Sequence, residues 1–288
     1  MSRTIHIIAP DLASAWIIAM KRVFFEGEPI RTEYDKNETE PSFDFTALIE
    51  IQQPLLPGKS QAQPHKADVY GVMSIRGGYL EEILEGNRDS QILESATSYP
   101  YTYHDRLFAY KAYNLEDKED VDPELHVKDV GSGLPPILKA SELQFPSINQ
   151  IDYIVEKLKE APYSRRAQGI TWRPMSDPHR EDCPCLQRVW ARVINGKLHL
   201  QTSWRSRDLY RALGANCVGM IAMQKMIADR LGVEMGSYAD FTNSLHIYGQ
   251  RKVIEEVIHM FERLQKREGL EPEYAKILEE RKKQFHIE

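Results

Sequence analysis

Apolar residues recur about every 3.6 positions over residues 10–26, which predicts an amphipathic helix that ends at Gly27. Alternating apolar and polar residues over 46–52 predict a strand. A short helix is predicted over 79–84, closed by Gly86. The N-terminal part of the chain therefore combines helices with strands.

The second half of the chain is patterned more regularly. The dipeptide Asn195-Gly196 separates two alternating runs, 186–193 and 198–202, and this predicts a β-hairpin. Residues 216–231 are nearly all apolar, so we expect a buried helix there. The remaining predicted elements are two amphipathic helices over 149–161 and 251–266 and two short strands over 168–172 and 244–248.

This order of elements has no regular βαβ alternation, and the sequence has no Gly-rich phosphate loop. Both observations favour an α+β fold. We expect one catalytic domain over residues 1–288, with a mobile loop at 31–41, a further loop at 53–66, a surface insertion at 114–148 and a solvated C-terminal tail at 267–288.

Composition narrows the class of protein. The formal net charge is −6, which argues against a general nucleic-acid-binding surface, and we expect no DNA partner. No apolar run approaches the roughly 18 residues of a membrane span, and the first ten residues lack the apolar stretch of a secretory signal. Three cysteines cannot form a disulfide framework and suit a reducing compartment, so we expect a cytoplasmic protein.

The segment Cys183-Pro184-Cys185 is the first candidate for chemistry. A zinc site needs further ligands at suitable spacing, and only His179 is close, so we expect no metal. A cysteine nucleophile needs thiolate character, which nearby cations supply, and arginines are dense in this region. The alternative is that these cysteines are small buried side chains.

Two other groups of residues are suited to a nucleotide. The pairs Arg165-Arg166 and Arg205-Ser206 fit a phosphate dianion, although each could also be a solvated surface pair. Three further polar residues have both a structural and a binding interpretation: His246 and Tyr248 share one face of a predicted strand and suit a sugar hydroxyl, and Asn216 either caps a helix or reads a polar ligand edge.

Four segments hold these residues in a fixed order: SRRAQGITW (164–172), PCLQRVWARVINGKLHLQ (184–201), RSRDLYRALGAN (205–216) and HIYG (246–249). A twin arginine, a Pro-Cys before a hairpin, an Arg-Ser-x-Asp, an asparagine and a His-x-Tyr follow one another. This order resembles the thymidylate synthase family. The resemblance implies a mixed sheet flanked by helices in a homodimer formed through the sheet.

The resemblance also implies site roles. Cys185 is similar to the family nucleophile, which adds to C6 of a pyrimidine nucleotide. Asp208 matches a carboxylate near the cofactor and base, and Asn216 matches the reader of the pyrimidine O4 and N3 edge, which favours dUMP. The implied phosphate ligands are Arg205, Ser206, Arg31 and, from the other subunit, Arg165 and Arg166. His246 and Tyr248 match the pair that binds the ribose 3′-hydroxyl, and Tyr103 matches a tyrosine that helps to remove the C5 proton.

The family also has a glutamate before a glycine in its N-terminal half. Glu81, Glu82 and Glu85 precede Gly86, and we take Glu82 as the candidate while spacing leaves all three open. The implied reaction is reductive methylation of dUMP to dTMP with 5,10-methylenetetrahydrofolate or a related tetrahydropterin.

The chain departs from the common family pattern at two positions near the nucleophile. Trp204 stands where glutamine is usual, and Leu186 stands where histidine is usual. These departures leave a pyrimidine nucleotide hydroxymethylase, acting on dCMP, CMP or dUMP, as the alternative enzyme. A non-catalytic nucleotide-binding or RNA-regulatory protein is a third hypothesis, which the presence of Cys185 disfavours.

Overall fold

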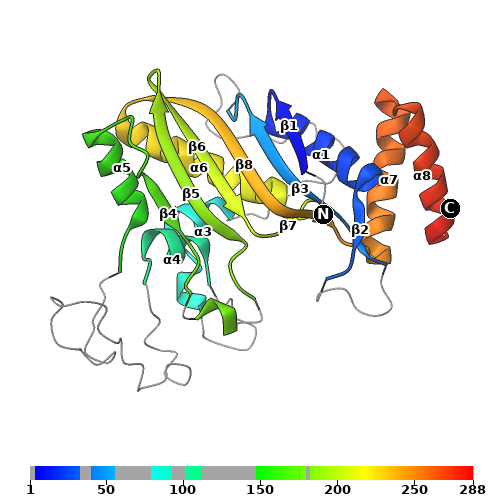
Figure 1. Ribbon diagram of the computed structural model, residues 1–288, viewed down its shortest axis with the longest axis horizontal. Coiled ribbons are helices and arrows are strands. Elements are labelled where there is room, and N and C mark those ends of the chain that lie inside the picture. The colour runs from blue at the N-terminus through cyan, green and yellow to red at the C-terminus, as the bar shows by residue number, and fades with distance from the viewer. Residues whose placement is uncertain are drawn as a thin grey trace.

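An eight-stranded mixed sheet forms the centre of the computed structural model, which describes residues 4–32, 40–55, 79–92, 101–111, 147–174, 176–179 and 182–287 (Figure 1). The main strand order is β1-β3-β8-β6-β5-β4, and β2 pairs with β3 while β7 pairs with β8. The strands are β1 (Thr4–Ala9), β2 (Glu28–Ile30), β3 (Ser42–Ile51), β4 (Gln168–Ile170), β5 (Leu186–Ile194), β6 (Lys197–Trp204), β7 (Arg207–Asp208) and β8 (Glu234–Ile247).

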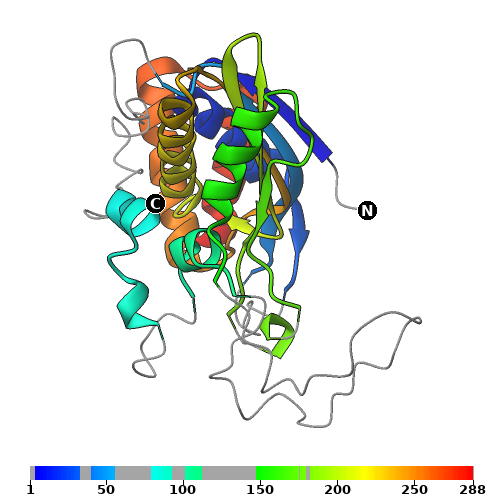
Figure 2. The same ribbon diagram turned by 90° about the vertical axis from the view of Figure 1, so that its left-hand side faces the viewer.

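The described helices lie to one side of this sheet, as the view along its edge shows (Figure 2). They are α1 (Leu12–Glu26), α3 (Tyr79–Glu85), α4 (Tyr103–Phe108), α5 (Gln150–Glu160), α6 (Leu213–Leu231), α7 (Arg251–Glu268) and α8 (Pro272–Phe285), with short 3₁₀ turns η1 (Asp89–Gln91) and η3 (Asp177–His179). The mixed sheet and its helical layer confirm the predicted α+β fold.

Local sequence explains where the main helices begin and end. Asp11 caps α1 by accepting a hydrogen bond from the backbone N–H of Ser14 at 2.7 Å. Asn149 caps α5 through the backbone N–H groups of its first turn. Gly232 ends α6 with a φ of +67°, a left-handed conformation that glycine adopts without strain. These signals account for the agreement between predicted and observed helix bounds.

Burial alternates along the strands because one face of the sheet packs on the helices. Trp16 of α1 and Tyr238 of β8 are completely buried in the resulting core. No helix of the described part of the chain covers the opposite face, which we call the open face (Figure 2). The strand register places Leu48, Trp190 and Phe241 together with polar side chains on this face.

The structure differs from the expectations at several elements. The strand predicted over 244–248 is the end of the fourteen-residue β8, whose first part contains glycine and polar residues that hide the alternation. β1 was not predicted at all. The tail is not simply solvated, because α8 buries Leu278 and Phe285 against the core. Most of the predicted loops at 31–41 and 53–66, and nearly all of the predicted insertion at 114–148, lie outside the described residues.

A buried ion pair joins β7 to β8. Arg207 Nη2 lies 2.7 Å from Asp240 Oδ2, and both side chains are 1% exposed. The same carboxylate accepts hydrogen bonds from the hydroxyl groups of Thr202, Tyr238 and Thr242 at 2.9–3.1 Å. A buried charge needs such partners, so this network holds β6, β7 and β8 in one arrangement.

The Asp240→Asn variant should test this constraint. Removing one charge leaves Arg207 buried and uncompensated, so we expect the free energy of unfolding to fall by about 3–5 kcal/mol. The measurement is urea denaturation followed by circular dichroism. Asp229→Asn is the matched control, because its carboxylate pairs with Lys225 at the surface and should change stability by about 0–1 kcal/mol. Equal losses in the two variants would contradict the assignment.

Candidate active site

Cys185 lies in the loop that leads into β5, and Arg205 holds this loop from the end of β6. The backbone N–H of Arg205 donates to the carbonyl of Cys185 at 2.8 Å. The Arg205 guanidinium donates to the carbonyls of Pro184 and Cys183, at 3.1 and 2.8 Å. These three bonds fix the backbone on both sides of the thiol.

The thiol of Cys185 is a free, half-buried group in a mixed electrostatic environment. Burial raises its pKa above the ordinary cysteine value, while the positive charges of Arg205 and Arg207 act in the opposite direction. A bare thiol in this place is therefore mostly protonated at neutral pH, and Arg205 is the largest source of thiolate stabilisation.

The short strand β7 connects this region to the end of β8. Asp208 stands opposite His246 in parallel register, and the backbone N–H of Leu209 donates to the His246 carbonyl at 2.8 Å. One oxygen of the Asp208 carboxylate accepts from the backbone N–H of Arg211 at 2.9 Å. Burial raises the pKa of Asp208. The Arg-Ser-Arg-Asp run, whose last two residues form β7, therefore extends from the Cys185 loop to His246.

His246 and Tyr248 are in contact at this end of β8. Their ring centroids are 4.6 Å apart in an edge-to-face arrangement, as expected for two residues on one face. His246 is buried, and its Nδ1 lies 3.4 Å from the hydroxyl of Ser244, which donates to Asp44. Within the described residues, the buried Nε2 of His246 has no hydrogen-bond partner. The ring is therefore held on one side and offers a polar atom on the other.

Asn216 lies in the first turn of α6, and the helix-cap interpretation is wrong. The helix begins at Leu213, so the Asn216 side chain follows the cap position. Its amide Nδ2 donates to the hydroxyl of Tyr79, in α3, at 2.7 Å. Tyr79 was not singled out in the sequence, because nothing in the chain pattern marks a tyrosine at the start of a short helix.

Tyr103 is enclosed between Trp204 and other tyrosines. Its ring meets Trp204 edge-on at a centroid distance of 5.6 Å, and Tyr101 lies at the same centroid distance. Burial raises the pKa of Tyr103, and the Tyr101, Cys185 and Tyr79 groups raise it further. Tyr103 therefore lies in one neighbourhood with Cys185 and Tyr79.

The two departures from the common family pattern have structural explanations. Trp204 is fully buried, and the Arg207 guanidinium lies over its ring at 3.6 Å from the centroid. Leu186 is also fully buried. Both side chains belong to the core beneath the candidate site.

The other predicted residues lie further out. Glu82 of α3 forms an ion pair with Arg88 at 3.3 Å and keeps 15% of its side chain exposed. Arg31 is exposed after β2, and Ser206 is half-buried between β6 and β7. Arg165 and Arg166 are exposed in the turn before β4, where the indole N–H of Trp190 and the hydroxyl of Tyr153 donate to their backbone carbonyls.

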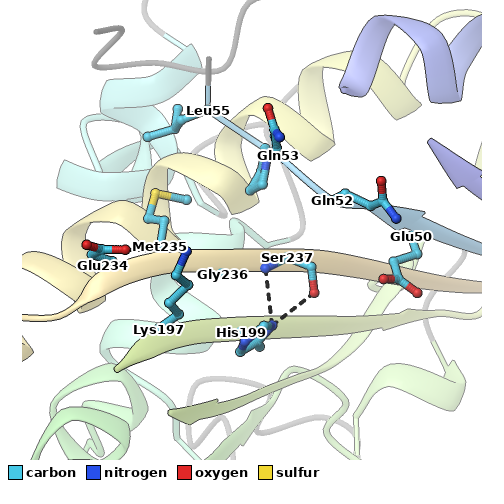
Figure 3. Close-up of a pocket in the computed structure, with 11 residues that line it drawn as sticks. Glu50, Gln52, Gln53, Leu55, Lys197, His199, Glu234, Met235, Gly236 and Ser237 are labelled. Atoms are coloured by element: carbon cyan, nitrogen blue, oxygen red, sulfur yellow. Dashed lines mark hydrogen bonds and ion pairs between the residues drawn. The ribbon is translucent and has the colours of Figure 1, made fainter. Parts of the chain in front are cut away.

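An open cavity of about 650 Å³ lies at the opposite end of the sheet, where β6 and β8 begin (Figure 3). His199 stands in its wall, and its Nδ1 accepts from the backbone N–H of Ser237 at 3.1 Å. Burial lowers the pKa of His199. The length of β6 separates this cavity from Arg205, and none of the predicted site residues lines it.

No cluster of three or more His, Cys, Asp or Glu side chains suited to a metal ion is present among the residues that the structure describes. None of the helices in the described ranges is long and apolar enough to cross a membrane.

The electrostatic role of Arg205 can be measured through Cys185. Arg205→Met removes the charge that lowers the thiol pKa, so we expect the pH midpoint of Cys185 alkylation by iodoacetamide to move upward. Peptide mass spectrometry separates Cys185 from the other cysteines. Arg230→Met is the control, because Arg230 pairs with Asp152 at 2.8 Å and lies at the far end of α6. An unchanged midpoint in Arg205→Met would refute the role.

Comparison with known proteins agrees with this geometry. The family model described as thymidylate synthase matches residues 107–287. The chain is 30% identical to a protein of Methanocaldococcus jannaschii named "Putative thymidylate synthase", over 84% of this chain and 90% of that relative. A protein of the same name from Methanothermobacter marburgensis is 26% identical over 84% of this chain and 92% of its own length. On the extent of these matches, the chain belongs to the thymidylate synthase family.

Proposed function

We propose that the chain is a thymidylate synthase that methylates dUMP to dTMP through a covalent Cys185 adduct. The observation that carries this proposal is the arrangement around β7. Arg205 fixes the Cys185 loop at one end of the Arg-Ser-Arg-Asp run, and Asp208 stands beside His246 at the other. The required nucleophile, phosphate ligand and ribose ligand are thereby joined by one short segment.

The same arrangement suggests how the nucleotide binds. Arg205 and Ser206 supply donors for the phosphate dianion close to Cys185. His246 and Tyr248 take the ribose 3′-hydroxyl, for which the buried His246 Nε2 is a suitable partner. Asn216 meets the O4 and N3 edge of the base, because its amide can both donate and accept.

The negative charge of a bound phosphate would oppose the stabilisation of the Cys185 thiolate by Arg205. The reactivity of the thiol therefore depends on the balance of these two charges. When the Cys185 thiolate attacks C6, the C5–C6 double bond opens and negative charge develops on C5 and O4. C5 then becomes the carbon that accepts the one-carbon unit. Tyr103, enclosed near Cys185, is the candidate for helping to remove the C5 proton, with Glu82 as the acid–base carboxylate.

The cofactor that the family implies is 5,10-methylenetetrahydrofolate, which supplies the one-carbon unit and, for methylation, the hydride. Asp208 fits the N–H-rich edge of a pterin, because its half-buried carboxylate has the acceptor capacity that such an edge needs. Asp208 would thus hold the pterin side of the site while β7 fixes its backbone.

We further propose a homodimer of single-domain subunits in which the open face is the interface. This face carries the apolar side chains of Leu48, Trp190 and Phe241, a composition typical of buried surface. The Trp190 indole also fixes the backbone of Arg165 next to this face. Arg165 and Arg166 are exposed in their own subunit, so a partner would receive them at its phosphate site.

Product analysis tests the reaction. The protein incubated with dUMP and methylenetetrahydrofolate should yield dTMP together with dihydrofolate, and the Cys185→Ala variant should lose turnover while it still binds dUMP. Mass spectrometry identifies the nucleotide, and absorbance follows dihydrofolate. Hydroxymethylated nucleotide with released tetrahydrofolate would replace the synthase by the hydroxymethylase. Failure with dUMP, UMP, dCMP and CMP alike would refute both.

Subunit complementation tests the shared site. Heterodimers of one Cys185→Ala subunit and one Arg165→Ala/Arg166→Ala subunit contain one complete site, so they should regain about half the wild-type activity of a dimer with two sites. Arg205→Ala replaces the twin-arginine variant in the matched control. Because Arg205 and Cys185 belong to one chain, that heterodimer has no complete site and should stay inactive. Equal activity of the two heterodimers would contradict the shared site.

A further inference from the structure

The hydrogen bond between Tyr79 and Asn216 joins two helices that are far apart in the sequence. Asn216 Nδ2 donates to the Tyr79 hydroxyl at 2.7 Å, and this bond occupies one lone pair of the phenol oxygen. The amide's other N–H and its carbonyl oxygen make no further hydrogen bond to the described residues. A phenol that accepts from Asn216 still has its own hydrogen to donate.

The packing of α3 on α6 keeps the phenol in this position. Gly219 lies one turn after Asn216 in α6, directly beneath the Tyr79 ring. A Cβ at residue 219 would come within 3.3 Å of Tyr79 and 3.2 Å of Ile83, which is tighter than ordinary side-chain contact. The glycine therefore permits the close approach of the two helices.

The electrostatics of the phenol favour a hydrogen-bond donor. Burial raises the pKa of Tyr79 to about 12, so its hydroxyl keeps its proton at neutral pH. Tyr79 and Cys185 both raise the pKa of Tyr103, so the Tyr79 phenol and the nucleophile lie near the same side chain.

We infer that Tyr79 is a substrate-contacting residue of the proposed reaction, and that its hydroxyl donates to O4 of the pyrimidine beside Asn216. This inference rests on the proposed function, because it assumes that a uracil nucleotide occupies the site. Addition of the Cys185 thiolate at C6 places negative charge on O4, and a prepositioned donor stabilises that charge as it develops. No proton needs to leave the phenol in this role.

Tyr79 differs in this respect from the carboxylate on the same helix. Glu82 follows one turn later and is paired with Arg88. An ionised carboxylate accepts hydrogen bonds and would repel a developing oxyanion, whereas a neutral phenol donates. The structure thus assigns the O4 contact to Tyr79 and leaves acid–base work to Glu82.

The test compares two nucleotides in two variants. Tyr79→Phe removes only the hydroxyl, so dUMP should bind about five- to tenfold more weakly, as expected for one neutral hydrogen bond. Binding of 4-thio-dUMP should weaken less than twofold, because sulfur is a poor acceptor while the rest of the nucleotide is unchanged. Isothermal titration calorimetry gives both dissociation constants. Gly219→Ala displaces the Tyr79 ring, so this variant should also weaken binding of dUMP more than binding of 4-thio-dUMP.

Tyr274→Phe is the matched control, because its hydroxyl donates to Glu26 away from the site and both affinities should stay unchanged. A parallel loss for dUMP and 4-thio-dUMP in Tyr79→Phe would show a purely structural role and overturn the inference. Unchanged dUMP binding in that variant would also overturn it. Wild-type protein that binds neither nucleotide would overturn the proposed function itself, and the inference with it.

Discussion

The ion pair between Arg207 and Asp240 is the constraint on which the candidate site depends. Arg207 lies between Arg205 and Asp208 in the four-residue run 205–208. Because the Arg207 side chain is buried in an ion pair, it fixes the backbone from which the flanking side chains extend. Arg205 is directed to the Cys185 loop and Asp208 to the end of β8. A buried network in which both oxygens of the Asp240 carboxylate accept hydrogen bonds tolerates little displacement, which suits residues that must meet one small ligand.

The sequence predicted those elements whose periodicity is carried by large apolar side chains. α1, α5 and the β5–β6 hairpin agree with their predicted positions because caps and the Asn-Gly turn add local signals. α7 has no side-chain cap and agrees through its amphipathic pattern alone. The first part of β8 escaped prediction, since its buried positions include Gly236, Asp240 and Thr242, which satisfy a network instead of forming an apolar stripe. The burial of these polar side chains depends on hydrogen-bond partners that are distant in the sequence, and local sequence patterns do not reveal such partners.

For the candidate site, sequence order predicted residues of the Cys185 loop, β7 and the end of β8. In the structure Arg205 is hydrogen-bonded to the Cys185 loop, and Asp208 stands opposite His246. It did not predict Asp44, which accepts a hydrogen bond from Ser244 beside His246, or Tyr79, which accepts one from Asn216 of α6. The ambiguity among the glutamates of α3 has a similar origin. A helix of seven residues offers little periodicity, and the direction of each side chain follows from the close contact at Gly219.

The pairing of β3 with β8 has a consequence for the synthesis of this protein. These strands are neighbours in the sheet although 200 residues separate Asp44 from Ser244. Contacts between such distant segments form late, because chain closure precedes the stabilisation that they bring. During translation, β3 emerges long before β8 can pair with it. Its backbone donors and acceptors remain a template for other chains in that interval, so nascent molecules depend on protection against aggregation.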